Sequence, residues 1–390
     1  MTVKETLHQE VSALETDLRG LSDYIFANPE LGHQEFKSSK AHIALLEKHG
    51  FTVETPYAGF DTAFRATFDS GQPGPTIAYL SEYDALPSIG HGCGHNMLGT
   101  VDTGAGIALS KVINQTGGRV IVLGTPAEET TGTKVDMANS GVFDDVDVAM
   151  CTHPSDENTM SGTSMAIHPI AFEFFGKPAH AAEAPEEGIN ALDAMLNLFN
   201  NINSLRQEMR SSARVHGIIT HGGDAANVIP EYTRAEFYVR ALDTPYMEVL
   251  SEKIINCAKA AALASGCTMK HTDFENIYKD MITNETLSAV YNENASELGI
   301  EMVPEKLGEN GSIDMGDVSH VVPSIHSYYS ITNGKRVIGH TPEFRDCTQT
   351  PFAYDMMMKV VETLALTGVD VISKPELLVE IQTEFANRKV

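Results

Sequence analysis

Apolar residues recur at two different periods along this chain of 390 residues, and the two periods predict alternating helices and strands. Over residues 4–27, leucine, valine and isoleucine recur every three or four positions, which is typical of one face of a helix. The continuous apolar run at 119–125 instead predicts a strand buried on both faces of a sheet. By the same reasoning we expect helices at 38–48 and 100–114, and strands at 51–55, 61–69, 76–81 and 146–151.

The order of elements changes between residues 165 and 277. Strands are predicted at 166–175, 214–220, 233–241 and 268–273, and helices at 190–206 and 246–265. The resulting order β-α-β-β-α-β is the ferredoxin-like split pattern. From residue 282 the earlier alternation resumes, with a helix at 284–298, a strand at 325–331 and a helix at 350–367. The pattern therefore predicts a two-domain α/β protein, with 1–164 and 278–390 forming one domain and 165–277 inserted as a second.

Composition excludes several classes of function. Lys and Arg number 27 against 53 Asp and Glu, a formal charge of −26, and so acidic a surface disfavours nucleic acid. No apolar run approaches the roughly 20 residues that span a bilayer, and the first residues form no signal-peptide core. Five scattered cysteines, an odd number, argue against a disulfide framework. We therefore expect a cytoplasmic protein that binds neither membrane nor nucleic acid.

Candidate metal ligands follow several of the predicted strands. A Cys-x-His pair stands on a glycine-bounded turn, two adjacent glutamates follow the strand at 119–125, and two further histidines come after later strands. Loops at the carboxyl ends of strands in an open α/β sheet meet in one crevice, so residues far apart in sequence can share a site. A thiol, imidazoles and a carboxylate suit one or two borderline ions such as zinc or manganese. The five ligand candidates are Cys93, His95, Glu129, His153 and His340.

The adjacent glutamates suggest a division of labour. Neighbouring carboxylates on a turn cannot both point the same way, so one can bind a metal while the other lies over the activated water. We assign Glu129 as the ligand and Glu128 as the general acid/base.

Several motifs resemble those of zinc-dependent metallopeptidase family twenty, which includes aminoacylase, carboxypeptidase G, carnosinase and the amino-acid-conjugate amidohydrolases. The resemblance covers nearly the whole chain and is nearest to the aminobenzoyl-glutamate hydrolase and dipeptidase-like branch. The motifs are Asn28-Pro-Glu-Leu-Gly32 with Glu35, Glu82-Tyr-Asp-Ala-Leu-Pro87, His91-Gly-Cys-Gly-His-Asn96, Gly124-Thr-Pro-Ala-Glu-Glu129, Gly176-Lys-Pro-Ala-His180, Asn227-Val-Ile-Pro230 and Gly339-His-Thr-Pro-Glu-Phe344.

The resemblance implies a mixed-sheet catalytic domain of the di-metal peptidase type and a lid domain that mediates dimerisation. It implies that Cys93 bridges two ions, that the other four candidates are terminal ligands, and that Asp84 orients a ligand. The wider family has His-x-Asp where this chain has Glu82-Tyr-Asp84, so one usual histidine ligand is missing. We assign no role to Asp314 or Asp317, which turn chemistry explains adequately.

Three polar residues of the lid match functional positions of the resembling family. His180 and Asn227 can donate hydrogen bonds to a developing oxyanion, and the histidine would act in its own subunit or across a dimer interface. Arg240 can bind a substrate carboxylate through two hydrogen bonds.

Together these observations predict a metallo-amidohydrolase or metallo-exopeptidase. It would cleave the amide bond of a dipeptide, an N-acyl amino acid or an aminobenzoyl-glutamate-like conjugate, with metal-bound hydroxide as the nucleophile. We expect two divalent ions, zinc first with manganese or cobalt as alternatives, a small-molecule or short-peptide substrate, and a homodimer or dimer of dimers formed through the lid. Two alternatives stay open: a thiol hydrolase that uses Cys93 as the nucleophile, and a metal-binding scaffold without catalytic activity.

Overall fold

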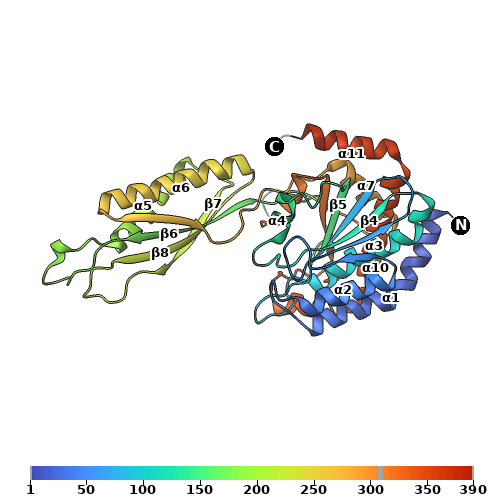
Figure 1. Ribbon diagram of the computed structural model, residues 1–390, viewed down its shortest axis with the longest axis horizontal. Helices are drawn as coiled ribbons and strands as arrows, with labels where there is room; N and C mark the ends of the chain where they lie inside the picture. The colour runs from blue at the N-terminus through green and yellow to red at the C-terminus, as the bar shows by residue number, and fades with distance from the viewer. Residues whose placement is uncertain (1, 306–310, 389–390) are drawn as a thin grey trace. The chain divides into compact units, whose positions relative to one another are not determined.

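The computed structural model describes residues 2–305 and 311–388, and it separates into two compact units. Unit 1 comprises Met1–Thr163, Met281–Leu307 and Asp314–Val390, and unit 2 comprises Ser164–Asp280 and Gly308–Ile313. Figure 1 shows both units, which are described separately below. Among the described residues, no helix is long and apolar enough to cross a membrane.

Unit 1 is built on a six-stranded mixed sheet in the order β1-β2-β4-β3-β5-β10. The strands are β1 (Thr52–Glu54), β2 (Phe64–Asp69), β3 (Thr76–Ser81), β4 (Arg119–Gly124), β5 (Val148–Ser155) and β10 (Ser324–Ser330). β1 and β2 run antiparallel to their neighbours, whereas β4, β3, β5 and β10 are parallel. Every residue of β4 after Arg119 is buried, as the continuous apolar run at 119–125 predicts for a strand covered on both faces.

Helices of unit 1 form layers on this sheet. The helix α3 (His95–Val112) packs on β3, β4 and β5, and both α1 (Val3–Ala27) and α10 (Pro351–Ser373) pack on α3. The apolar face predicted for the first helix is buried, with Leu7, Leu18 and Ile25 fully covered. The other helices are α2 (Phe36–Lys48), α4 (Thr133–Asn139), α7 (Glu285–Glu297), α8 (Met315–Ser319), α9 (Pro342–Cys347) and α11 (Pro375–Asn387), with a short 3₁₀ turn at Ile113–Gln115.

The start of α3 differs from the sequence prediction in a way that matters for the site. We expected this helix from residue 100, but it begins at His95. Gly94 is its N-cap in the left-handed conformation (φ 86°), and a Cβ at this position would lie 2.6 Å from Pro154 Cγ. Only glycine fits such a position. The turn at Gly94 therefore makes His95 the first residue of the helix.

Unit 2 has a four-stranded antiparallel sheet in the order β7-β8-β6-β9, with two helices on one face. Its main elements are β6 (Ala166–Phe175), α5 (Ala191–Leu205), β7 (Arg214–His221), β8 (Tyr232–Ala241), α6 (Thr244–Ser265) and β9 (Thr268–Asp273), with short 3₁₀ turns at Pro185–Glu187 and Arg206–Glu208. Alternate residues of β8, among them Phe237 and Val239, are buried with α5 and α6, while the intervening residues are partly exposed. The predicted α/β fold with a mixed sheet and an inserted ferredoxin-like domain is confirmed.

The chain crosses between the two units after Thr163 and again after Asp280, and a short later segment also belongs to unit 2. Residues 311–313 belong to unit 2, although we expected everything after 278 to belong to the first domain. Met165 donates its backbone N–H to Gly311 O at 2.9 Å, and Arg240 Nη1 donates to Ser312 Oγ at 3.0 Å. These contacts attach this short segment to the inserted domain.

Candidate metal centre

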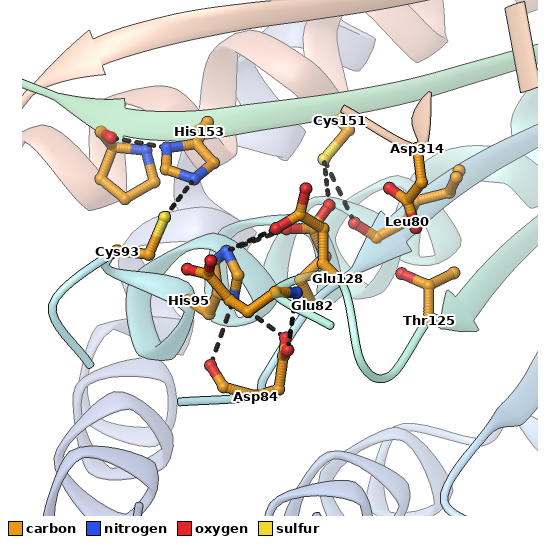
Figure 2. A network of polar contacts seen from close by, with 12 residues as sticks. Leu80, Glu82, Asp84, Cys93, His95, Thr125, Glu128, Cys151, His153 and Asp314 are labelled. Atoms are coloured by element: carbon orange, nitrogen blue, oxygen red, sulfur yellow. Dashed lines mark hydrogen bonds and ion pairs between the residues drawn. The ribbon is translucent and has the colours of Figure 1, made fainter. Parts of the chain in front are cut away.

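His95 is held at the start of α3 by Asp84, which follows β3. The ring Nδ1 of His95 lies 3.0 Å from Asp84 Oδ1 and 3.1 Å from Asp84 O. Both partners are acceptors, so Nδ1 carries the proton and Nε2 presents its lone pair. Asp84 Oδ2 also accepts the backbone N–H of Glu129 at 3.0 Å. The Asp84 carboxylate thus orients two of the predicted ligands, and Figure 2 shows its contact with His95.

Cys93, His95 and His153 form the first group of possible metal ligands, with one donor atom from each within 4.8 Å of the others. Cys93 Sγ lies 3.4 Å from His153 Nε2. The Nδ1–H of His153 donates to Pro154 O at 2.6 Å, which again leaves Nε2 as the free lone pair. His153 lies within β5 and not in the loop after it.

Cys93, Glu129 and His340 form a second such group, with the same limit of 4.8 Å between donor atoms. His340 Nε2 lies 3.4 Å from Glu129 Oε1. The backbone N–H of His340 donates to Gly92 O at 2.9 Å, which ties the two ligand loops together. Cys93 thus belongs to both groups, and the five predicted ligands meet around one thiol.

The donor atoms of these groups fit divalent ions. His95 Nε2 and Glu129 Oε1 are buried, and neither meets the geometry of a hydrogen bond with any described residue. Leaving such groups without a hydrogen bond costs free energy, and a cation bound at these atoms would remove that cost. A thiol, three imidazoles and a carboxylate are ligands typical of zinc and related ions.

Glu128 lies beside the first group. Its Oε2 is 3.9 Å from His95 Nε2, and its side chain keeps 14% of its surface exposed. Burial, with Glu82 and Asp314 nearby, raises the pKa of Glu128 well above its ordinary value. A raised pKa suits a carboxyl group that must hold a proton and then release it.

Ala127, the residue before Glu128, is held in place by Glu35 of the N-terminal segment. Ala127 has a positive φ of 60°, and its N–H donates to the buried Glu35 Oε1 at 2.8 Å. Thr62 donates to the other oxygen of Glu35 at 2.9 Å. Burial raises the pKa of Glu35 to about 7. The motif residue Glu35 therefore holds the loop that carries Glu128 and Glu129.

A buried ion-pair network behind the centre was not predicted from the sequence. Lys134, on α4, is fully buried, and its Nζ lies 2.7 Å from both Glu82 Oε1 and Asp314 Oδ1. Burial alone would lower the pKa of Lys134, but Asp314 and Glu82 outweigh it and raise this pKa. The assignment of Asp314 to ordinary turn chemistry is therefore wrong. Asp317 is also buried, beside it at the start of α8.

The three lid candidates all lie in unit 2, whereas every candidate ligand lies in unit 1. His180 is exposed, and its Nδ1 accepts the backbone N–H groups of Ala182 and Glu183 at 3.3 and 3.1 Å. These bonds leave the ring proton on Nε2 as a free donor. Ala181 N donates to Asn227 O at 3.0 Å, so the structure brings His180 and Asn227 together.

Arg240 lies on β8, and its guanidinium carbon is 5.5 Å from the ring centroid of Tyr238. The side chain is half-buried and donates to Ser312, as described above.

Known proteins resemble this chain over 70–94% of its length. An Xaa-Arg dipeptidase of Mus musculus is 38% identical over 384 residues, which cover 94% of this chain and 88% of that protein. One of the subunits of the p-aminobenzoyl-glutamate hydrolase of Escherichia coli is 34% identical over 293 residues, covering 70% of this chain and 60% of that protein. Residues 166–265 match the family description of a peptidase dimerisation domain. The chain belongs to the M20 peptidase family.

Solved structures agree with the fold. A putative aminohydrolase of methicillin-resistant Staphylococcus aureus superposes with a TM-score of 0.80 at 20% identity, covering 95% of this chain and all of that one. A Bacillus subtilis protein described as a dinuclear metal-binding peptidase of the M20 family gives a TM-score of 0.72 at 18% identity, covering 93% and 99%. This M20 protein is thus an enzyme that hydrolyses peptide or amide bonds, as the sequence predicts.

Proposed function

We propose that this M20 protein is a metal-dependent hydrolase of dipeptides, N-acyl amino acids or aminobenzoyl-glutamate-like conjugates, with Glu128 as its general acid/base. The observation that carries the proposal is that two groups of metal-ligand side chains share Cys93. A shared thiol is the arrangement expected of two ions bridged by one residue. We infer zinc as the native ion, with manganese or cobalt as alternatives, because the donors include a thiol and three imidazoles.

Each residue has a role that follows from its contacts. Divalent ions bound at this centre would polarise the scissile carbonyl and activate water at neutral pH. Asp84 orients the ring of His95 and the backbone of Glu129 through the hydrogen bonds described above. Glu128, with its Oε2 3.9 Å from His95 Nε2, would take a proton from the attacking water and deliver it to the leaving amine as the C–N bond breaks.

The lid would bind the rest of the substrate. His180, with its Nε2 proton free, and the neighbouring Asn227 would donate hydrogen bonds to the oxyanion, and Arg240 would bind the terminal carboxylate. The relatives include a dipeptidase named for a C-terminal arginine. The formal charge of −26 favours the approach of such cationic substrates, so we place Xaa-Arg and Xaa-Lys dipeptides first in the substrate panel.

The dimerisation-domain match supports assembly through unit 2. In this unit β7 is an edge strand, and Ile218 on it keeps 65% of its surface exposed. An exposed edge with an apolar residue is a ready surface for pairing with a second chain. We propose a homodimer or dimer of dimers, which light scattering at working concentration would detect. A monomer there would contradict this part of the proposal.

One observation favours a second candidate, a thiol hydrolase. Cys93 Sγ and His153 Nε2 lie 3.4 Å apart, as in a nucleophile–base pair. The electrostatics oppose it, because burial raises the pKa of Cys93 well above its ordinary value and lowers the pKa of His153 to about 3. Both shifts disfavour the thiolate–imidazolium pair that such chemistry needs.

The test is hydrolysis of a panel of dipeptides, acyl-amino acids and conjugates before and after exhaustive chelation. We expect chelation to abolish turnover and zinc, manganese or cobalt to restore it. Full activity in metal-free protein, combined with loss of activity on thiol alkylation, would establish the thiol hydrolase instead. Stoichiometric metal with no hydrolysis of any panel member would point to the catalytically silent scaffold.

A further inference from the structure

Lys134 is a fully buried cation that connects three elements of unit 1. It lies on α4, Glu82 follows β3, and Asp314 precedes α8. Nζ contacts one oxygen from each carboxylate at 2.7 Å. Asp314 also accepts the backbone N–H of Lys134 at 3.3 Å. Both the side chain and the backbone of Lys134 are thus held in place (Figure 2 shows Glu82 and Asp314).

Lysine is almost never fully buried unless it is paired, as Lys134 is with two carboxylates, and the presence of this buried group needs an explanation. Taking charges out of water is costly, and a buried ion pair is often no more stabilising than apolar residues of similar volume. Stability alone therefore gives little reason for a lysine here.

Glu82 divides its two oxygens between two neighbours. Oε1 is the atom held by Lys134, whereas Oε2 lies 3.2 Å from His95 Nε2. Neither Oε2 nor this Nε2 meets hydrogen-bond geometry with a described residue. The grip of Lys134 on Oε1 therefore decides where the free Oε2 lies relative to the imidazole nitrogen that faces the metal centre.

The Lys134 ammonium also explains how another group of potential metal ligands can lie together without needing an ion. Glu82, Cys151 and His326 are all buried, with donor atoms within 4.8 Å of one another. Cys151 Sγ lies 3.9 Å from Glu82 Oε1, the oxygen that Lys134 already holds. Lys134 thus supplies the positive charge at this carboxylate, and no further ion is needed there.

We propose that Lys134 is a positioning residue of the hydrolytic centre: shared between Glu82 and Asp314, its side chain fixes Glu82 so that Oε2 faces His95 Nε2. The inference rests on the proposed metal-dependent function and extends it to residues behind the ligands. A side chain that orients a group beside a metal ligand typically changes metal affinity or activity by about 10–100-fold when it is removed.

The alternative is that Lys134 only neutralises buried charge. The double variant Lys134→Met/Asp314→Asn separates the two ideas, because it removes one positive and one negative charge. It keeps the formal charge of the network and nearly the same side-chain volumes, yet it leaves Glu82 Oε1 without its cation. If neutralisation were the whole role, this variant would behave like the wild type.

The experiment loads wild type and variants with cobalt(II) and compares the visible absorption spectrum with kcat and KM for a dipeptide that the wild type cleaves. We expect the double variant to show a shifted cobalt spectrum and a kcat lower by at least about tenfold, with KM changed by less than about threefold. Lys4→Met, which removes an exposed lysine paired with Glu297, is the matched control and should change neither. A native spectrum and native kcat in the double variant would overturn the proposal.

A second variant keeps the test decisive if the double variant does not fold. Glu82→Gln can leave its oxygen on Lys134 and keep the Lys134–Asp314 pair, but it places an amide NH₂ toward His95. The same spectral shift and loss of kcat are expected, and native values for both would overturn the proposal. If the proposed metal-dependent function is wrong, the wild type itself will bind no cobalt or will be active without it. If only the role of Lys134 is wrong, the wild type will need cobalt and the variants will match it.

Discussion

The candidate metal centre of unit 1 and the candidate lid residues of unit 2 are built in opposite ways. In unit 1, His95 and Glu82 are buried and oriented by other side chains: Asp84 contacts His95, and Lys134 contacts Glu82. In unit 2, His180 and Asn227 are exposed and are held through backbone hydrogen bonds of their own loops. This difference fits the proposed division of roles, in which the buried groups of unit 1 hold ions and the exposed groups of unit 2 would contact the substrate.

The largest effect is expected within the pair of adjacent glutamates. Glu128→Gln removes the base and keeps the size of the side chain, so turnover should fall by about 10²–10⁴ while metal content persists. Glu129→Gln should instead lower metal content, because Glu129 shares its group with the ligand candidates Cys93 and His340, whereas Glu128 is grouped with Glu82 and His95. Elemental analysis beside steady-state kinetics measures both, and exchanged behaviours would reverse the two assignments.

A smaller loss is expected in the lid. His180→Ala should lower kcat by roughly 10²–10³ if Nε2 donates to the oxyanion, with metal content unchanged. His221→Ala, another partly exposed histidine of unit 2, serves as the control. Under proven subunit exchange, mixing His180→Ala with Glu128→Gln protein should restore some activity if His180 acts across the interface. No restoration would place it in its own subunit's site or outside catalysis.

Arg240 should affect binding more than chemistry. Arg240→Ala removes a charge-assisted contact to a substrate carboxylate, so KM should rise by about 10–100-fold for substrates with a free carboxylate and little for their amides. The matched control is Arg234→Ala on the same strand, where the guanidinium is already paired with Glu236 at 3.0 Å. Equal effects on acid and amide substrates would argue against carboxylate binding.

The smallest effect is expected on stability, at Glu35. Its pKa is raised by burial to about 7 in the folded protein, so its contribution is fully present at pH 4 and is lost as pH rises through 7. Glu35→Gln can still accept from Ala127 N–H but cannot ionise. Near pH 8 the free energy of unfolding of the variant should therefore be about 1–3 kcal/mol higher than that of the wild type. This difference should vanish near pH 4. Urea unfolding at both pH values measures this, and a pH-independent difference would contradict it.

Much of the fold was predictable because its elements follow local rules. The periodicity of apolar residues predicted the core strands and most helices, and the order of strands and helices predicted the inserted domain. The start of α3 was missed because it depends on the left-handed turn at Gly94, which helix propensity does not reveal. The helix α11 was missed although Leu377, Ile381 and Phe385 recur every four positions, because Pro375 is easily taken for the end of a helix, whereas here it begins one.

The candidate site was predictable as far as its chemistry shows in residue type. Thiol, imidazole and carboxylate side chains after strands indicated the ligands, and the structure brings Cys93, His95, Glu129, His153 and His340 together. Lys134 and Asp314 could not be predicted, because they are 180 positions apart and a lysine in a short polar helix usually faces solvent. Only tertiary packing brings such a pair into contact.

The central claim is that Cys93 is shared by two metal sites, and metal stoichiometry tests it most directly. We expect two ions per chain in the wild type, about one each in His153→Ala and His340→Ala, and fewer than one in Cys93→Ala, because only Cys93 belongs to both groups. Cys347→Ala, which removes another partly exposed thiol of unit 1, should retain two. Two ions retained in Cys93→Ala, or metal loss in only one of the two histidine variants, would contradict the account.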